Sequence, residues 1–273
     1  MKLRPEVEKT LKSALAAQAL FPLVDHGEMR GLPGSNPIAD ALDDYEAWDL
    51  ILEKILETPG YREKFEAAFP GEEINIGHVG EALAEFQGKN FFFADTPYDR
   101  YLEGSLEALT LEAKEGMDIF FGKGKCGECH NGELLSDMSF KNIASPQIGP
   151  GRMNGDDFGR YEWDSQEKSR YSFRVPPLRN VANTAPYFHN GAMKDLEAVV
   201  DHFNDIKFSL ENYILDEFKN YTDPIKGHDH STNEARYVLL PSVLPLSLGL
   251  TNEEKGRLLI FLREGLTDLR LKN

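Results

Sequence analysis

The sequence has few cysteines and no long apolar run. Only two of its 273 residues are cysteines, and no second Cys/His pair lies at the spacing of zinc ligands. A zinc site with about four protein ligands is therefore disfavoured. No apolar stretch approaches the roughly 20 residues that span a bilayer, so no membrane span is expected. The N-terminus also lacks the apolar segment and small-residue cleavage site of an export signal.

Basic residues are scarce relative to acidic ones. The chain has 30 Lys and Arg against 46 Asp and Glu, which gives a formal net charge of −16. This charge disfavours nucleic acid and anionic lipid as partners and favours a basic partner such as a small cationic redox protein, although solubility alone would explain the excess. The chain has neither an internal repeat nor a low-complexity tract. Its 41% of hydrophobic and 28% of charged residues are typical of a folded protein with one or two domains.

Both cysteines lie in the run Cys126-Gly127-Glu128-Cys129-His130. Cys-x-x-Cys-His is the attachment pattern of a c-type haem, and a redox dithiol is the alternative interpretation. The two thiols can each form a thioether to a haem vinyl group, and the imidazole of His130 then lies under the iron as its axial ligand. We therefore predict one covalent haem c. Because thioethers are formed on the oxidising side of the membrane, we expect a periplasmic protein whose export signal was removed, or part of a longer product.

Hydrophobic periodicity predicts an all-α fold. Helices are expected from Pro5 to about Leu20, over 42–55, 61–69, 76–86 and 111–121, after Lys194, and from the capping box Thr251-x-x-Glu254 onward. The stretch 131–171 is rich in Gly, Asp, Asn and Ser and predicts long loops. Such loops are uncommon in a compact domain unless something orders them, and a haem would do so.

Four segments carry a resemblance to a known family. The run 120–132 resembles the C-terminal haem site of the bacterial di-haem cytochrome c peroxidase and MauG family, and the run 175–191, from Val175 to Gly191, is similar to the second signature of that family. The segments 97–102 and 61–71 also fit. The order and spacing of these segments extend the resemblance over nearly the whole chain.

The resemblance implies two cytochrome c-like helical domains, each with one haem, and a calcium ion near their interface. One haem transfers electrons that a small cytochrome c or cupredoxin supplies, and peroxide is reduced at the other. In the MauG branch the haem pair instead oxidises side chains of another protein. Members of the family often form homodimers, so the resemblance allows a homodimer of this chain as well.

The chain departs from this plan because it has one Cys-x-x-Cys-His run rather than two. It resembles the later part of a di-haem enzyme. Residues 1–100 resemble the remnant of the N-terminal and bridging domain, and residues 101–273 resemble the cytochrome c-like haem domain. The first haem would belong to a separate chain or segment. A mono-haem module for electron transfer or ligand binding, without peroxidase activity, is the second class of function.

Glu28 is the candidate catalytic residue. The run Phe21 to Met29 is similar to the family segment that carries a glutamate in the distal pocket of the haem that is missing from this sequence, and Glu28 is the matching position. A carboxylate there can move a proton between the two oxygens of bound peroxide and so assist heterolytic O–O cleavage. A surface glutamate in a polar loop is the alternative.

The sixth iron ligand is the second departure from the family. That ligand is a Met in the peroxidases and a Tyr in MauG, fourteen residues after the His of the second signature, and counting from His189 reaches Phe203. A phenyl ring has no lone pair for iron. Phe203 would still face the haem, because the helical period places it on one apolar stripe with Leu196, Val199 and Val200, and His202 lies outside this stripe. Met193 is expected to fill the core and His202 to lie on the surface, so neither is an obvious substitute. We therefore expect a five-coordinate or water-ligated haem.

The resemblance also assigns the remaining site residues. The backbone oxygens of Thr184 and Pro186 would bind calcium together with an Asn from the absent domain and several waters, and such hard oxygen ligands suit this ion. A turn that packs on the haem edge is the alternative for these two residues. Arg179 and His189 would order loops or haem propionates, and a guanidinium is a suitable partner for a buried propionate.

Overall fold

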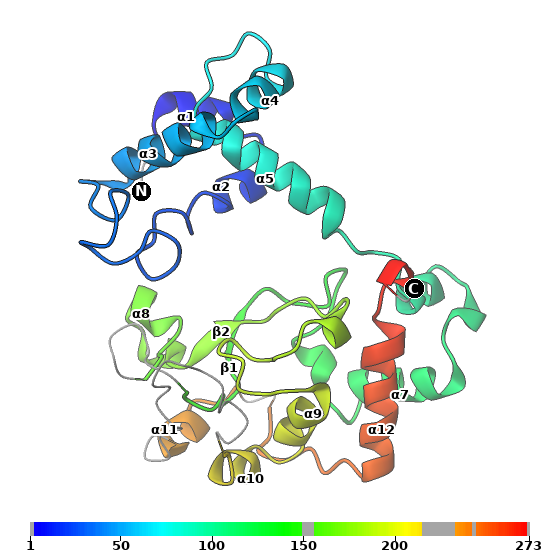
Figure 1. Ribbon diagram of the computed structural model, residues 1–273. Helices are drawn as coiled ribbons and strands as arrows, with labels where there is room; N and C mark the ends of the chain where they lie inside the picture. Colours follow the sequence, from blue (N-terminus) through cyan, green and yellow to red (C-terminus); the bar gives the residue numbers. More distant parts are fainter. Residues whose placement is uncertain (1–2, 149–155, 215–232, 242–243, 272–273) are drawn as a thin grey trace. The chain divides into compact units, whose positions relative to one another are not determined.

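The computed structural model describes residues 3–148, 156–214, 233–241 and 244–271 (Figure 1). The chain divides into two compact units, Met1–Phe92 and Phe93–Asn273. The division follows Phe92, whereas the sequence placed the boundary after residue 100. None of the helices within the described ranges combines the length and the apolar character that a membrane crossing requires.

The first unit is helical. Its helices are α1 (Pro5–Thr10), α2 (Ala14–Gln18), α3 (Asp44–Glu57), α4 (Tyr61–Ala68) and α5 (Ile76–Asn90). The predicted single helix from Pro5 to Leu20 was wrong. Helix α1 ends at Thr10, and the backbone of the next residue, Leu11, is extended. Ser13 then starts helix α2, because its side chain accepts the backbone N–H of Ala16 at 3.0 Å. An N-cap serine favours a new helix start over continuation, which explains the break.

The core of the first unit surrounds Trp48. This side chain is fully buried among Val7, Leu20, Ile76 and Val79. Its indole Nε1 donates a hydrogen bond of 3.2 Å to the backbone oxygen of Leu20. Because Leu20 precedes the long connection between α2 and α3, this bond fixes the start of that connection on the helical core.

The second unit is also mainly helical. Its helices are α6 (Pro97–Leu102), α7 (Leu111–Phe121), α8 (Tyr161–Asp164), α9 (Leu196–Asn204), α10 (Ile206–Glu211), α11 (Asn233–Val238) and α12 (Asn252–Ile260). Strands β1 (Phe140–Asn142) and β2 (Ser172–Arg174) pair antiparallel, with Phe140 opposite Arg174. The predicted helix-rich fold is confirmed. The small sheet was not predicted: β1 lies within the stretch 131–171 that was expected to be loops, and β2 directly follows that stretch.

The crossing of α7 and α12 forms the core of the second unit (Figure 1). The predicted capping box starts α12, since Thr251 Oγ1 accepts the N–H of Glu254 and the Glu254 carboxylate accepts the N–H of Thr251. Phe120 of α7 packs edge-on against Phe261, with 5.4 Å between the ring centroids. Cys126 packs against the same core cluster, so the predicted haem motif lies next to it.

A buried carboxylate joins the two ends of the second unit. Asp268 is fully buried and accepts the backbone N–H of Asp95 at 3.1 Å. It also accepts the backbone N–H, Nε and Nη2 of Arg270 at 3.0, 2.9 and 3.0 Å. Its own backbone N–H donates to Asn180 Oδ1 at 2.7 Å. The hydrogen bonds from Arg270, against a smaller opposing effect of burial, lower the pKa of Asp268 to about 2.

This carboxylate predicts a dependence of stability on pH. A depressed pKa contributes stability that is present above the ordinary value of 3.8 and is lost as the pH falls through the folded value of about 2. We expect Asp268→Asn to lower the free energy of unfolding by about 1–2 kcal/mol at pH 6, discounted for the solvent exposure of Arg270. Urea unfolding of both proteins between pH 6 and pH 2 measures this difference. A difference that does not shrink below pH 4 would contradict the assignment.

Candidate functional site

The three residues of the predicted haem motif share one tight turn after α7. Lys125 has a left-handed backbone with φ of 55°, and the 3₁₀ turn Cys126–Glu128 follows. The backbone N–H groups of Cys129 and His130 both donate to the oxygen of Cys126, at 3.2 and 2.8 Å. The turn therefore brings both thiols and the imidazole to one place, as the motif requires.

The two thiols are free of a disulfide, and both are partly buried. Burial raises the pKa of Cys126 to about 12. Burial also raises the pKa of Cys129, although the charge of Lys141 opposes this shift. These surroundings disfavour the stabilised thiolate that a redox dithiol needs at neutral pH.

His130 is held in the neutral form that binds a metal. Its Nδ1 lies 3.0 Å from the backbone oxygen of Leu135, which accepts the Nδ1 proton. In this tautomer the lone pair is on Nε2, the atom that would face iron. Burial lowers the pKa of His130, and the backbone oxygens of Leu135 and Pro176 partly oppose that shift. The donor set therefore suits an axial imidazole.

Large apolar side chains near the motif remain exposed to solvent. They are Phe121, Leu134, Met138 and Phe140, with exposed fractions of 43, 51, 47 and 43%. Phe121 ends α7 directly before the motif, and the other three lie on the loop and strand directly after it. A porphyrin bound at the motif would cover apolar surface of this kind, so the surroundings as well as the donors fit a haem.

Arg179 connects α6 to the loop that follows the motif. Its Nε and Nη2 donate to the two carboxylate oxygens of Asp99 at 3.0 and 2.6 Å, and its Nη1 donates to the backbone oxygen of Glu133. Arg179 thus contacts the loop after the motif through the backbone oxygen of Glu133. Its expected contact with a haem propionate stays a prediction.

His189 lies in a different environment. Its ring stacks on Phe173 with 3.4 Å between centroids, and its Nε2 is 3.6 Å from a carboxylate oxygen of Asp157. Burial lowers the pKa of His189 to about 4, although Asp157 opposes the shift. The imidazole is therefore neutral at physiological pH. Its expected contact with a haem propionate stays a prediction.

The predicted calcium ligands lie on the loop between Arg179 and His189. Thr184 follows the 3₁₀ turn Val181–Asn183, and its hydroxyl donates to the oxygen of Val181 at 3.1 Å. In the part of the chain that the structure describes, no group of three His, Cys, Asp or Glu side chains is arranged to hold a metal ion. Calcium would therefore depend on backbone oxygens such as those of Thr184 and Pro186, and it stays a prediction.

The expected surface position of His202 was wrong. This side chain is fully buried in α9, where its Nε2 lies 2.8 Å from the oxygen of Ile143 and its Nδ1 lies 3.0 Å from the hydroxyl of Ser209. Burial lowers its pKa to about 4. The segment after β1 and helix α10 cover this face of α9, which periodicity within α9 cannot reveal. With both ring nitrogens in hydrogen bonds, His202 is a poor candidate for an iron ligand.

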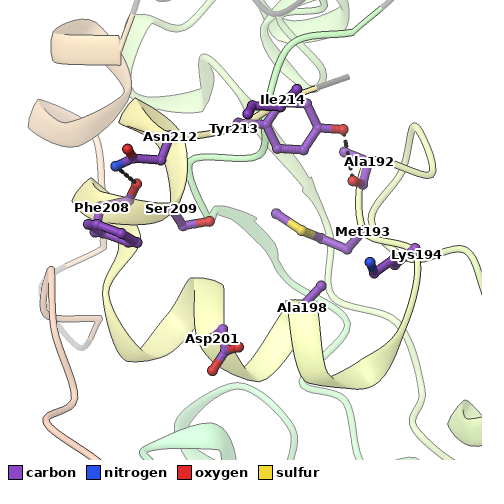
Figure 2. Close-up of a pocket in the computed structure, with 10 residues that line it drawn as sticks. All are labelled: Ala192, Met193, Lys194, Ala198, Asp201, Phe208, Ser209, Asn212, Tyr213 and Ile214. Atoms are coloured by element: carbon purple, nitrogen blue, oxygen red, sulfur yellow. Dashed lines mark hydrogen bonds between the residues drawn. The ribbon is translucent and has the colours of Figure 1, made fainter. Parts of the chain in front are cut away.

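Met193 is buried, in line with its expected role in packing. It is 4% exposed, and Figure 2 shows its side chain pointing into a pocket of about 290 Å³ beside α9 and α10. Residues from both helices and the loop before α9 line this pocket: Ala192, Met193, Lys194, Ala198, Asp201, Phe208, Ser209, Asn212, Tyr213 and Ile214. Phe203 is half-buried, and its ring lies 6.2 Å from that of Phe188. The predicted absence of a family-type sixth ligand is not tested by these contacts.

Glu28 lies in the first unit, on the connection between α2 and α3. This connection is organised by Arg30, which is buried and donates to the oxygens of Ile38 and Ala41 at 3.1 and 2.6 Å and to Asp44 at 3.1 Å. Glu28 itself is exposed. The carboxylate therefore stands on an ordered connection, and its catalytic role stays a prediction.

Sequence reasoning did not single out Asp99 or Leu135. The start of α6, where Thr96 and Asp99 form a capping box around Pro97, offered a signal for Asp99 as an ordered carboxylate. Leu135 contributes through its backbone oxygen, and no side-chain pattern reports such a contact. Its left-handed backbone, with φ of 50°, is a property of the folded loop alone.

Comparison with known proteins agrees with the resemblance seen in the sequence. Residues 8–107 match the family model described as di-haem cytochrome c peroxidase. The chain is 34% identical to the methylamine utilization protein MauG of Methylorubrum extorquens over 193 residues, which are 70% of this chain and 48% of that protein. It is 33% identical to the cytochrome c peroxidase Ccp of Escherichia coli over 174 residues, which are 63% of this chain and 36% of that protein.

A solved structure agrees with the fold. A crystal structure of a MauG-like protein associated with microbial copper homeostasis matches with a TM-score of 0.66 and 29% identity, over 93% of this chain and 69% of that one. The matched regions span 48% and 36% of the length of the two relatives named above.

Proposed function

We propose that this chain, a homologue of the di-haem cytochrome c peroxidases and MauG proteins, carries one covalent haem c on Cys126, Cys129 and His130 and acts in the reduction of hydrogen peroxide. The observation that supports this proposal most directly is the tight turn of Cys126, Cys129 and His130, in which the imidazole donates its Nδ1 proton to the oxygen of Leu135. The relatives include both cytochrome c peroxidases and MauG.

The chain's own residues have distinct parts in this function. Cys126 and Cys129 would hold the porphyrin, and His130 would bind the iron through Nε2. The haem supplies reversible one-electron chemistry when it is bound. Glu28 would act at the other haem, whose motif this sequence does not contain. It would take a proton from one peroxide oxygen and return it to the other, so that two electrons and two protons convert hydrogen peroxide into two waters.

Completion of the enzyme needs a first haem domain. The chain has one Cys-x-x-Cys-His run, and the family model that it matches describes a di-haem protein. We infer that a separate chain or segment carries the other haem and that a small basic cytochrome c or cupredoxin supplies electrons, in keeping with the net charge of −16. Periplasmic location, a homodimer and calcium on Thr184 and Pro186 belong to the same proposal.

Two other functions have specific support. The MauG relative is 34% identical, which favours oxidation of a protein substrate as an alternative. The single haem motif favours a mono-haem module for electron transfer or ligand binding. These functions differ from peroxidase activity in one respect that an assay detects, since neither consumes peroxide with a reduced cytochrome as the donor.

A peroxide assay tests the proposal. The mature protein, purified with any haem-bearing polypeptide that accompanies it, is expected to oxidise a reduced small cytochrome c when hydrogen peroxide is added. Glu28→Gln should lower turnover by about 100-fold or more, because general acid–base assistance is lost. Glu63→Gln, at an exposed position of α4, is the control. An assembly with two haems that shows no peroxide-dependent oxidation would overturn the peroxidase function.

A further inference from the structure

We propose that Arg179 and Asp99 form a clamp that positions the axial imidazole of His130 through the backbone oxygen of Leu135, and so sets the reduction potential of the haem. The proposal rests on the haem centre proposed above. In it, Arg179 and Asp99 are positioning residues, since they act through the loop that follows the motif.

The clamp begins as a fixed, bidentate ion pair. Two guanidinium nitrogens of Arg179 donate to the two oxygens of Asp99, and the side chains are only 17% and 12% exposed. Asp99 Oδ2 also accepts the backbone N–H and the hydroxyl of Thr96, at 3.0 and 2.7 Å. A carboxylate with all these partners has one orientation. The start of α6 therefore anchors the guanidinium, and the planar fork of arginine transmits that orientation.

The third nitrogen of the guanidinium reaches the loop. Nη1 of Arg179 donates to the oxygen of Glu133, two residues before Leu135. Within the loop, the N–H of Leu135 donates to Gly132 at 3.0 Å and the N–H of Ser136 donates to Asn131 at 2.9 Å. These bonds close a short turn, and the clamp fixes it against α6.

The turn holds Leu135 in an unfavourable backbone conformation. Its φ of 50° is in the left-handed region, where the Cβ of a leucine lies too close to the following carbonyl oxygen. Such conformations persist where the surroundings determine them, and here the side chain is 1% exposed in the core while the carbonyl accepts the Nδ1 proton of His130. The left-handed backbone thus aims the carbonyl at the imidazole, and the bond from Arg179 helps to maintain it.

A second hydrogen bond joins the loop to the segment that leads to Arg179. The hydroxyl of Ser136, next to Leu135, donates to the oxygen of Val175 at 2.7 Å. The guanidinium of Arg179 and this bond therefore hold the loop on both sides of Leu135.

The expected consequence is electronic. An imidazole that donates its Nδ1 proton to a carbonyl is a more basic ligand, and a more basic ligand favours the oxidised iron. A looser clamp weakens that hydrogen bond. The reduced iron is then favoured, and the midpoint potential rises.

The test uses the haem-loaded chain with Arg179→Lys and Asp99→Asn. Lysine keeps the positive charge but cannot make the bidentate pair, so its effect is not that of a lost charge. Each variant is expected to shift the reduction equilibrium about tenfold toward reduced iron, which is 59 mV for one electron. The iron–histidine stretching frequency, measured by resonance Raman after photolysis of the carbon monoxide adduct, should fall, because this vibration responds to the Nδ1 hydrogen bond.

Arg4→Lys is the matched control. This arginine of the first unit makes a bidentate pair with Asp49, with 2.8 Å for each hydrogen bond, and its replacement should leave both the potential and the vibration unchanged. If Arg179→Lys does not accumulate as a folded protein, Asp99→Asn, which preserves the side-chain volume, decides the question. Variants that retain covalent haem with an unchanged potential and an unchanged vibration overturn the clamp alone. A wild-type chain without covalent haem overturns the proposed function and the clamp together.

Discussion

Replacement of Cys126 and Cys129 together by serine is expected to abolish covalent haem attachment. Both cysteine thiols of the chain lie in this one turn, and a hydroxyl does not form a thioether with a haem vinyl group. Each single serine variant retains one sulfur and should retain a single bond to the porphyrin. The variants are compared by the mass of the denatured protein and by its visible absorption after extraction with acidic acetone, which removes only non-covalent haem.

Glu128→Gln is the control for the haem-attachment variants. Glu128 lies between the two cysteines and is exposed, so its replacement alters the charge of the turn without removing a sulfur. This variant should bind haem as the wild-type chain does. If the double serine variant also retained haem through extraction, the attachment would involve other residues, and the assignment of both cysteines would be wrong.

Gly116→Ala is expected to lower the free energy of unfolding by about 3 kcal/mol, a large effect for a single methyl group. A Cβ at Gly116 would lie 2.0 Å from the backbone oxygen of Arg257 and 2.9 Å from the Cβ of Phe261. The contact is between the backbones of α7 and α12, so no side-chain rotation relieves it and the two helices must separate. Urea or thermal unfolding measures the change.

Gly256→Ala is the matched control for the packing prediction. Gly256 lies in α12, next to the residue that Gly116 contacts, and a Cβ there would meet nothing within 4 Å. Alanine is a better helix former than glycine by about 1 kcal/mol, so this variant should be equally stable or more stable. Equal stability of both variants would show that α7 and α12 do not approach as closely as the structure indicates.

The helices of the second unit could be predicted where local signals agreed. The apolar spacing over Leu111–Phe121 is followed by glycines, and helix α7 has these bounds. The capping box Thr251-x-x-Glu254 marks the start of α12 in the same way. At both positions the side chains that end or begin the helix are adjacent to the periodic pattern, so no distant contact is needed to decide the structure.

Other features depend on contacts between distant segments. His202 was expected on the surface because its position on α9 is outside the apolar stripe of that helix. Ile143 and Ser209 satisfy its two ring nitrogens, and neither partner is visible in the periodicity of α9. The pairing of β1, within the stretch expected to be loops, with β2, directly after it, joins residues about 30 positions apart, and three-residue strands are too short to give a clear alternation.

The candidate site shows the same limit. The motif itself identifies Cys126, Cys129 and His130 because the chemistry needs these residues at this spacing. The partners of His130 are backbone oxygens, and the pair of Arg179 and Asp99 joins positions that are 80 residues apart. Pairs of residues so far apart in the sequence are seen only in the folded chain. The motif therefore indicated the side chains that would hold the haem, and the structure added the contacts that orient His130.

The mass of the denatured mature protein tests the central claim most directly. The account predicts the mass of the polypeptide plus one haem, with the added mass on a peptide that contains Cys126 and Cys129. A mature protein that was produced with the haem-attachment machinery and has the mass of the polypeptide alone would contradict it.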